Sequence, residues 1–330
     1  MTRESLFEEF KNKKVIVLGD VMIDAYLSGE VNRMSPEAPV PIVDFKKREE
    51  RLGGAANVAL NLISLGAQVT MSTVIGNDAA AKKMMQLFEE STISAHGILQ
   101  TDTRQTTMKT RVIGNFQQLL RIDQEQKHDL LKIEEDQLIA RVEDLLKEGY
   151  DALIFEDYNK GILTHRVIQE VIQLTKRYGV ITTVDPKLDN FLSYVGVTLF
   201  KPNLKELKEG VQQQFDVQDR DQFEGAVKTL RSKIQPKIVF VTMSEHGVYI
   251  DSKEERHYIA AHPRMISDVS GAGDTVIGVA TLCLAAQQPI STIAQMANLA
   301  GGIVCEQRGV VAINAQHLLD EANKFDIECG

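Results

Sequence analysis

Hydrophobic and polar residues follow one another along the chain in a rhythm that predicts strands separated by helices. Short apolar runs, such as Val-Ile-Val-Leu at 15–18, are typical of buried strands, whereas longer segments with apolar residues every three or four positions indicate helices. Strands are predicted at 14–18, 69–75, 152–155, 180–184, 197–200 and 238–242, and helices at 53–65, 78–90, 134–147, 164–178, 203–210, 219–232, 272–286, 290–306 and 315–324. Apolar strands that alternate with helices predict an α/β fold of three layers, α/β/α, around a mainly parallel central sheet.

Other segments have the pattern of exposed or antiparallel strands. They are 39–45, 109–113, 118–123, 248–250 and 257–259. The prolines of the first segment suit an edge strand, and Gly114-Asn115 between the second and third predicts a hairpin. No repeat, low-complexity run or linker interrupts the chain, so we expect one domain over residues 1–330, in which strands near 39–45 and 109–123 form a small lid.

The composition is that of a soluble globular protein, with 43% hydrophobic and 25% charged residues among 330. No apolar stretch reaches the ~18–20 residues that crossing a bilayer requires, and the N-terminus lacks the apolar core of a signal peptide. We therefore expect a cytoplasmic protein without membrane contact. The net charge of −9, with no basic stripe, argues against nucleic acid as a partner.

Cysteine and histidine usage argues against a metal site held by these side chains. Cys283, Cys305 and Cys329 form no Cys-x-x-Cys pair, which predicts reduced thiols, and the seven histidines have no ligand spacing. A metal ion is expected only as magnesium that arrives with a nucleotide, since that ion needs few protein oxygens.

Several predicted strands end in polar residues. The exits are Gly19-Asp20, Glu156-Asp157-Tyr158, Asp185-Pro186-Lys187, Lys201-Pro202-Asn203 and Thr242-Met243-Ser244. A single Asp after a strand is usually a turn or cap residue, but five polar exits from one parallel sheet make a continuous rim. Ligands of such sheets bind beyond the carboxyl ends of the strands, so the rim predicts a small-molecule site.

The segment 268–275, Asp-Val-Ser-Gly-Ala-Gly-Asp-Thr, leads directly into an apolar helix. Gly271, Ala272 and Gly273 let the backbone approach a ligand, and the first N–H groups of a helix attract phosphate. Asp274 places a carboxylate inside this turn, which suggests transfer of a phosphoryl group to a hydroxyl, with the Asp taking the proton. The alternative is a tight helix start in which Asp is only a favoured first-turn residue.

Two regions, 268–275 and Gly53-Gly54-Ala-Ala-Asn57, resemble the signature regions of the PfkB (ribokinase-like) carbohydrate kinases. A narrower resemblance, to the D-glycero-D-manno-heptose 7-phosphate kinases of the ADP-heptose pathway, rests on further segments. They are 19–24, 33–42 (Arg-Met-Ser-Pro-Glu-Ala-Pro-Val-Pro-Ile), 51–59, 117–123, 157–161, 184–187, 202–206 and 244–247. The resemblance covers nearly the whole chain. It implies a ribokinase-like fold, transfer of the ATP γ-phosphate to the C1 hydroxyl of heptose 7-phosphate in lipopolysaccharide core precursor synthesis, and a homodimer formed through the lid strands.

On the catalytic and nucleotide side, the resemblance assigns the base to Asp274 and the amides that face the phosphoryl group to Gly271, Ala272 and Gly273. We expect the helix N-terminus to lower the pKa of Asp274, which leaves a weak but well-placed base. Support of magnesium and the ATP phosphates falls to Asn203 and Glu206, whose spacing also fits a helix capping box. Contacts with the nucleotide are assigned to Thr242, Ser244, Gly247 and, in the adenine pocket, Asn298.

On the sugar side, Asp20 is expected to accept sugar hydroxyls, with Gly53, Gly54 and Asn57 close to the ring. Candidate cations for the 7-phosphate are Arg111, Arg121, Lys160 and Lys187. Asp157 and Asp185, at the strand exits, complete the expected substrate edge. A Lys or Arg at a strand end is often only solvated, and the sequence alone leaves that alternative open.

Two departures from the resembled group are visible. Ser270 stands where relatives often have Thr, and no His-x-Gly-His nucleotidyl-transfer motif occurs before Gly330, so a separate adenylyltransferase is expected to act later in the route. The alternatives are a PfkB kinase for another sugar or sugar phosphate and a non-catalytic sugar-binding relative. A dinucleotide-dependent oxidoreductase and a P-loop NTPase are disfavoured, because neither Gly-x-Gly-x-x-Gly after the first strand nor Gly-x-x-x-x-Gly-Lys-Ser/Thr occurs.

Overall fold

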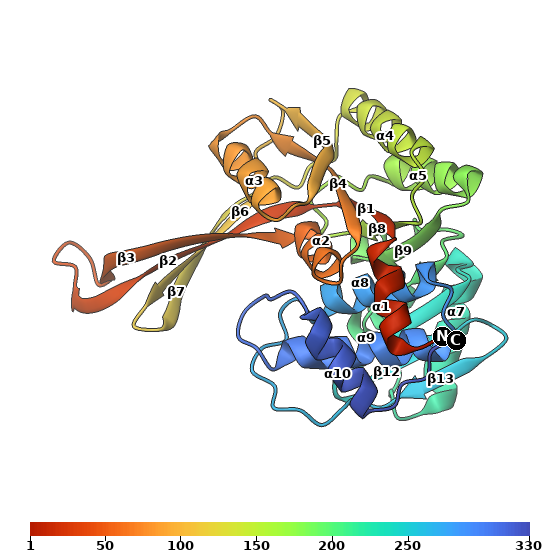
Figure 1. Cartoon of the computed structure of the whole chain (residues 1–330). Coiled ribbons are helices and arrows are strands. Elements are labelled where there is room, and N and C mark those ends of the chain that lie inside the picture. Colours follow the sequence, from red (N-terminus) through yellow and green to blue (C-terminus); the bar gives the residue numbers. More distant parts are fainter.

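A nine-stranded sheet forms the centre of the computed structural model, which describes residues 1–330 (Figure 1). Its strands lie in the order β13-β12-β11-β10-β9-β8-β1-β4-β5, and those from β11 to β5 run parallel. The strands are β1 Lys14–Gly19, β4 Gln68–Gly76, β5 Ser94–Thr101, β8 Ala152–Glu156, β9 Ile181–Asp185, β10 Leu199–Phe200, β11 Ile238–Thr242, β12 Val248–Asp251 and β13 Arg256–Ile259. The last two are antiparallel, as the sequence predicts, whereas β5 lies outside the predicted strands.

Helices cover both faces of this sheet, and the three-layer α/β/α architecture is confirmed. They are α1 Arg3–Lys11, α2 Ala55–Ser64, α3 Ala79–Glu90, α4 Lys132–Lys147, α5 His165–Tyr178, α6 Leu204–Val211, α7 Arg220–Ile234, α8 Ala272–Ala285, α9 Ile290–Cys305 and α10 Ala315–Lys324, with short 3₁₀ turns at Leu188–Asn190 and Ser244–His246. One core contains side chains of α4 to α7, and the other contains side chains of α1, α2, α3, α8, α9 and α10.

Strand β1 shows why this layering follows from the sequence. Val15 and Val17 belong to the core on the α8 side, whereas Ile16 and Leu18 belong to the core on the α4 to α7 side. Successive side chains of a strand point to opposite faces, so a continuous apolar run buries both. Each fully buried aliphatic side chain stabilises the fold by about 1.5–3 kcal/mol. Helix α8 is buried around most of its surface, because α2 and α9 both pack against it.

A four-stranded sheet projects from this body (Figure 1), in the order β3-β2-β6-β7. Its strands are β2 Val21–Met34, β3 Pro41–Gly54, β6 Met108–Gly114 and β7 Gln117–Gln124. The hairpin of β6 and β7 is confirmed, and its turn residues Asn115 and Phe116 have φ of 50° and 67°. Strand β3 lies at an edge, as its prolines predict, but it continues to Gly54 and pairs with β2, which the sequence pattern did not indicate. Helix α2 therefore begins after Gly54 and not at Gly53.

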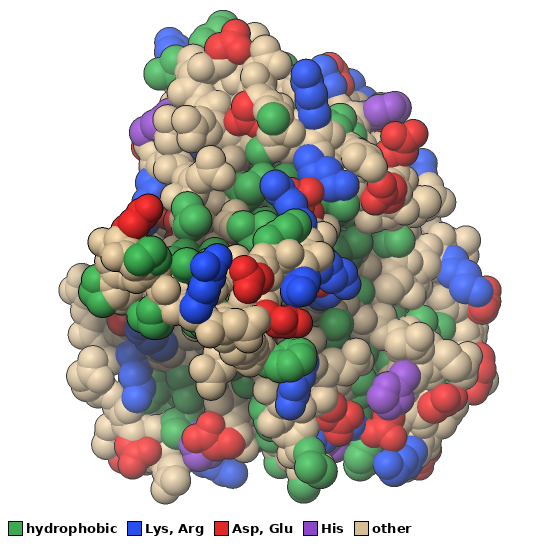
Figure 2. Space-filling view, turned by 90° about the vertical axis from the view of Figure 1, so that its left-hand side faces the viewer, with side chains coloured by type: hydrophobic (Ala, Val, Ile, Leu, Met, Phe, Trp, Pro, Cys, Tyr) green, Lys and Arg blue, Asp and Glu red, His purple; other side chains and the backbone are tan.

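The projecting sheet has one charged face and one more apolar face. Tyr26, Arg111 and Arg121 are register partners across three strands and share a face. Leu120 and Ile122 alternate with Arg121 on β7, so they point the other way, and each is 50% exposed. Figure 2 views the molecule from the side of this sheet and shows hydrophobic side chains beside basic and acidic ones.

The two ends of the chain lie side by side (Figure 1). Arg3 of α1 donates to the carbonyl of Ile327 and forms an ion pair with Asp326, just beyond α10. None of the helices combines the length and the apolar character that crossing a bilayer requires.

Candidate active site

The polar strand exits meet at one edge of the main sheet. Gly19 is the register partner of Glu156, and Glu156 is the register partner of Asp185, so β1, β8 and β9 end at the same level. Lys201 follows β10, and Asn203 forms a bridge with Thr242 at the end of β11. The predicted rim is therefore a continuous feature of the structure.

The turn before α8 brings Asp274 to this rim. Gly271 caps the helix with φ of 79°, and a Cβ there would lie 2.9 Å from Asn57 Nδ2 and 3.0 Å from Val310. A side chain at Gly271 would therefore meet both backbone strain and a crowded site. Asp274 lies in the first helical turn and is only 8% exposed. Its Oδ2 accepts a hydrogen bond from Asn57 Nδ2 at 2.6 Å, and its Oδ1 accepts one from the hydroxyl of Tyr158 at 3.0 Å.

The acidity of Asp274 differs from the expectation. Burial raises the pKa of Asp274 to about 6, and the negative charge of Asp185 adds to this effect, against the hydrogen bonds from Asn57 and Tyr158. The prediction that the helix N-terminus lowers this pKa is therefore wrong, because removal of the carboxylate from water outweighs the favourable contacts. The higher pKa makes Asp274 a stronger base than expected.

Glu156, Asp185 and Asp274 form a cluster of buried carboxylates whose oxygens lie within 4.8 Å of one another. Burial, followed by the charges of Asp185 and Asp274, raises the pKa of Glu156 well above its usual value. Lys201 Nζ lies 2.8 Å from Asp185 Oδ2 and compensates part of the negative charge. Glu156 Oε2 is buried without a hydrogen-bond partner. An unpaired buried carboxylate oxygen beside two others is a donor set that suits a divalent cation.

Sequence reasoning did not assign Glu156 or Lys201 to the site. The sequence signal for Glu156 is the alternation of side chains along a strand. Glu156 lies two residues after Ile154 on β8 and therefore points to the same face, which packs toward α8, whereas Asp157 follows the end of the strand. The carboxylate of Asp157 accepts hydrogen bonds from the N–H of Asn159 at 2.8 Å and the hydroxyl of Tyr194 at 2.8 Å. Asp157 is 0% exposed and both of its carboxylate oxygens accept hydrogen bonds within the protein, so its carboxylate holds the surrounding segments together.

Asn203 and Glu206 form the reciprocal capping box at the start of α6. Glu206 N–H donates to Asn203 Oδ1 at 2.8 Å, and Asn203 N–H donates to Glu206 Oε2 at 2.9 Å. Lys187 Nζ lies 2.7 Å from Glu206 Oε1. Although burial alone would lower it, the pKa of Lys187 is raised by Asp185 and Glu206. Lys187 thus forms one cluster with Asn203 and Glu206, the two residues that were expected to support magnesium and the ATP phosphates.

Asp20 lies beyond β1 with its carboxylate turned toward the 158–162 loop. Its Oδ2 accepts the N–H groups of Tyr158 at 2.8 Å and Lys160 at 3.1 Å, and its Oδ1 accepts that of Ile162 at 3.3 Å. Burial, followed by the charge of Asp157, raises the pKa of Asp20 to about 6. Asp20 therefore shapes the loop that carries Lys160, in addition to any contact with a sugar.

Gly53 and Gly54, also predicted near the sugar, lie where β3 meets β2 and α2. A Cβ on Gly53 would lie 2.2 Å from Asp24 Oδ2, and Gly54 has φ of 61°. Both positions therefore require glycine, for close approach and for backbone conformation respectively. Asn57, three residues later in α2, is 1% exposed.

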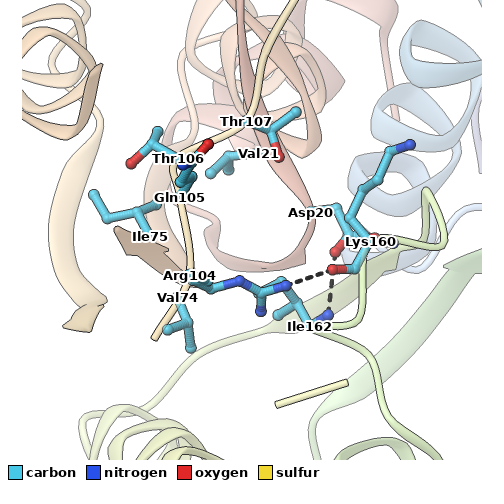
Figure 3. Close-up of a pocket in the computed structure, with 10 residues that line it drawn as sticks. All are labelled: Asp20, Val21, Val74, Ile75, Arg104, Gln105, Thr106, Thr107, Lys160 and Ile162. Atoms are coloured by element: carbon cyan, nitrogen blue, oxygen red, sulfur yellow. Dashed lines mark hydrogen bonds between the residues drawn. The ribbon is translucent and has the colours of Figure 1, made fainter. Parts of the chain in front are cut away.

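Arg104, a buried arginine that the sequence pattern did not reveal, supports the 158–162 loop (Figure 3). Arg104 Nη2 donates to the carbonyl of Lys160 at 2.6 Å. The same atom donates to the carbonyl of His128 at 3.3 Å. Arg104 Nη1 is buried without a partner, and Arg104 lines a cavity of about 10 Å³ together with Asp20 and Ile162. That volume corresponds to about one water molecule.

The remaining predicted cations are all paired with acids. Lys160 Nζ lies 2.7 Å from Glu125 Oε2, and Arg111 pairs with Asp24. Arg121 makes a two-fold contact with Asp123, with distances of 2.6 and 2.8 Å. These pairs lie on or beside the charged face of the projecting sheet. Lys109, on the same face, has its pKa lowered by burial and by the nearby ammonium of Lys160.

A cavity of about 710 Å³ opens on the other side of the α8 turn. Its lining includes six of the residues that were predicted to contact the nucleotide or the phosphoryl group: Thr242, Ser244, Gly247, Ala272, Gly273 and Asn298. Sequence reasoning missed the part of its wall at 261–266, which contributes His262 and Arg264. Arg264 is held by Glu306 at 3.1 Å and by Glu321 of α10 at 2.5 Å.

The fold and this site define a sugar kinase of the ribokinase-like class, and comparison with known proteins gives the family. The model of the pfkB family carbohydrate kinases matches residues 12–316, so the chain belongs to that family. Among curated proteins it is similar to the bifunctional protein HldE of Syntrophotalea carbinolica, with 34% identity over 96% of this chain and 64% of that protein. It is also similar to the bifunctional protein HldE of Desulfatibacillum aliphaticivorans, with 39% identity over 94% of this chain and 63% of that protein. The chain thus spans less than two thirds of the length of these relatives.

Solved structures share the fold at low sequence identity. A tetrameric inhibited form of phosphofructokinase-2 from Escherichia coli matches with a TM-score of 0.75 and 17% identity, over 94% of this chain and 99% of that chain. Ribokinase from Arabidopsis thaliana, in complex with ribose and ATP, matches with a TM-score of 0.69 and 16% identity, over 93% and 98% of the two chains. These likenesses confirm the ribokinase-like α/β fold.

Proposed function

We propose that this protein transfers the γ-phosphate of ATP to the C1 hydroxyl of D-glycero-D-manno-heptose 7-phosphate, giving the 1,7-bisphosphate in ADP-heptose synthesis. The observation that carries the proposal is the position of Asp274, between the nucleotide-side cavity and the sugar-side residues Asp20 and Asn57. Membership of the PfkB family and similarity to the HldE proteins support a sugar-phosphate acceptor. An ATP-dependent step of this kind fits the cytoplasm.

The chain's own residues supply the base and the anion-binding amides. The oxygen of the sugar hydroxyl attacks the γ-phosphorus while Asp274 accepts the proton of that hydroxyl. The bond between the γ-phosphorus and the oxygen that bridges to the β-phosphate breaks, which releases ADP. The N–H groups of Gly271, Ala272 and Gly273 lie at the start of α8, where they can face the charge on the transferred group; that of Ala272 also donates to the carbonyl of Val269 at 3.3 Å. Asn57 keeps the base oriented through its contact with Oδ2.

The carboxylate cluster fits the magnesium that accompanies ATP. Glu156 and Asp185 would hold the ion, since Glu156 Oε2 has no partner and both oxygens of Asp274 already accept hydrogen bonds. When bound, the ion neutralises charge on the ATP phosphates. In this arrangement Asn203 and Glu206 do not hold the ion themselves. They form the capping box of α6, and Glu206 positions the ammonium of Lys187.

The distal phosphate of the sugar would bind at the cations near the projecting sheet. Lys160 is the first candidate, because its ammonium lies beside Glu125, the residue after β7, and its own N–H donates to Asp20 at 3.1 Å. Arg111 and Arg121 on adjacent strands are the next candidates. Each cation now pairs with an acid, so phosphate binding would exchange one charged partner for another, and unphosphorylated sugars would leave these pairs unchanged.

We also propose that the projecting sheet pairs two copies of the chain. Its exposed apolar side chains include Phe45, Phe116, Leu120 and Ile122, with exposures of 61%, 104%, 50% and 50%. A sheet that presents such a face to water is a typical interaction surface. Light scattering after gel filtration tests this: a mass of one chain would contradict it.

The proposed reaction is tested by measuring ADP release over a panel of acceptors, with ³¹P NMR of the product. Heptose 7-phosphate is expected to give the highest kcat/KM and a product with a second, anomeric phosphate. Fructose 6-phosphate, ribose and fructose serve as competing acceptors. A preference for free ribose or fructose would reject the heptose assignment and leave a PfkB kinase for another sugar.

A further inference from the structure

Tyr158 contacts three different parts of the candidate site. Its backbone N–H donates to Asp20 Oδ2 at 2.8 Å, and its hydroxyl donates to Asp274 Oδ1 at 3.0 Å. The ammonium of Lys187, which pairs with Glu206, lies 5.5 Å from the centroid of its ring. One residue thus contacts the sugar-side carboxylate, the base and the nucleotide-side cation, and none of the roles proposed above uses its side chain.

We infer that Tyr158 is a positioning residue for phosphoryl transfer, whose hydroxyl fixes the Asp274 carboxylate in the orientation from which it takes the proton of the sugar hydroxyl. The inference rests on the proposed function in one respect, namely that Asp274 is the base.

The geometry explains why a second contact is needed. The terminal torsion of an Asp side chain has a broad energy minimum, so a single hydrogen bond leaves the carboxylate free to turn. Asn57 holds Oδ2 at 2.6 Å, and Tyr158 holds Oδ1 on the other side of the group. Each carboxylate oxygen has two lone pairs, so the two contacts leave one lone pair on each oxygen, and either can accept the sugar hydroxyl.

The hydroxyl can be removed without disturbing the other two contacts of the residue. Phenylalanine keeps the backbone N–H that donates to Asp20 and keeps the ring beneath Lys187. Tyr158→Phe therefore deletes one interaction only, that with Asp274. Loss of a positioning contact lowers kcat and leaves KM unchanged, whereas general damage to the site changes both.

Tyr194 offers a matched control. Its hydroxyl also donates to a carboxylate, that of Asp157, at 2.8 Å, and its ring is fully buried. Tyr194→Phe removes the same kind of hydrogen bond close in space to Tyr158 but does not touch Asp274. It is expected to lower Tm and to leave kcat unchanged within the error of the assay.

The experiment compares steady-state kinetics of the two variants, using ATP and the acceptor that the wild type turns over best. We expect Tyr158→Phe to lower kcat by about 10- to 100-fold, as for loss of a hydrogen bond to a charged group, with KM for both substrates retained. Unchanged kcat, or an equal fall in Tyr194→Phe, would overturn the inference. Absence of wild-type turnover on every sugar would instead contradict the proposed function.

A spectroscopic measurement covers the case in which Tyr158→Phe does not fold. Incorporation of 3-fluorotyrosine in place of Tyr158 keeps the ring and the hydroxyl, and its ¹⁹F resonance reports the partner of that hydroxyl. We expect Asp274→Asn to shift this resonance more than Asp157→Asn does. An equal shift, or no shift with Asp274→Asn, would overturn the inference.

Discussion

The amide of Asn57, in the first turn of α2, donates to the carboxylate of Asp274, in the first turn of α8, across 2.6 Å of space and 217 positions of sequence. The two signature regions of the family thus meet at a single hydrogen bond. Because α2 and α8 are packed against each other in the same core, the contact is set by the fold and not by a flexible loop.

Asp274→Asn is expected to lower kcat by at least about 10²-fold, because the amide cannot accept the proton of the attacking hydroxyl. ATP affinity, measured by calorimetry, should change little. Asp268→Asn is the control: Asp268 lies in the same turn but accepts N–H groups of Ser270 and Gly309, so its loss should affect stability more than turnover. Near-normal turnover in Asp274→Asn would remove this residue as the base.

The pH dependence follows from the raised pKa values of about 6 for Asp274 and Asp20. The base acts only when ionised, so kcat/KM should be constant above pH 7 and fall below about pH 6, by tenfold per unit if Asp274 alone is required. A steeper fall indicates that Asp20 must also be ionised. Circular dichroism at each pH separates this effect from unfolding, and a profile that stays flat to pH 5 would contradict it.

Gly271→Ala should reduce both stability and activity. The residue has φ of 79°, and its new Cβ would lie 2.9 Å from Asn57 Nδ2, which holds Asp274. Gly179→Ala is the matched control, because Gly179 has φ of 71° and open space around its Cβ position. Both variants should lose about 1–2 kcal/mol of unfolding free energy from backbone strain, measured with urea, but only Gly271→Ala should lose turnover. Equal activity of the two would show that the contact with Asn57 is unimportant.

Glu156→Gln tests the carboxylate cluster. Without this charge, half-maximal activity should require about 10-fold more Mg²⁺ or greater, since a hard cation prefers charged oxygens. In metal-free buffer at alkaline pH, where Glu156 is ionised despite its raised pKa, the variant should unfold at a higher temperature than the wild type, because one of three crowded buried charges is gone. Glu134→Gln, at a buried Glu of α4 bonded to Thr101 and Thr103, should show neither effect. Unaltered magnesium dependence of Glu156→Gln would place the ion elsewhere.

Lys160→Met examines recognition of the distal phosphate. KM for heptose 7-phosphate should rise about 10-fold or more with the loss of a charge-assisted contact, while KM for unphosphorylated heptose stays unchanged. Lys127 pairs with the same Glu125, at 3.2 Å, and its side chain is 66% exposed, so Lys127→Met is the control. A similar rise for both sugars in Lys160→Met would show that the residue shapes the loop and does not read the phosphate.

The main sheet was predictable because parallel strands covered on both faces must be apolar throughout, and β1, β8 and β11 all have this signature. Strand β2, and the part of β3 beyond residue 45, escaped prediction for the opposite reason. Much of their length is exposed, and segments such as Phe45-Lys-Lys-Arg-Glu-Glu-Arg51 have no apolar alternation. The pairing of β2 with β3 on one side and with β6 on the other supplies the order that local sequence does not indicate.

The site divides in a similar way. Asp274 and Asn57 lie in motifs whose local sequence predicts a turn followed by the start of a helix. Glu156 and Lys201 were indicated only as members of the polar strand exits, and Arg104 not at all, because the importance of these residues depends on which face of a strand or loop becomes buried. Likewise, the pKa of Asp274 could not be inferred from its helix position alone, since burial raises it and the charge of Asp185, on strand β9, adds to the effect.

The contact of Arg3 with Ile327 and Asp326 has a topological consequence. All residues discussed for the site lie between Asp20 and Glu321, and the ends of the chain meet at the surface beside α1 and α10. The order of segments along the polypeptide is thus separable from their arrangement in space. A circular permutant that joins the two ends and opens the chain at the exposed Gly149 turn would retain every strand pairing and the whole site.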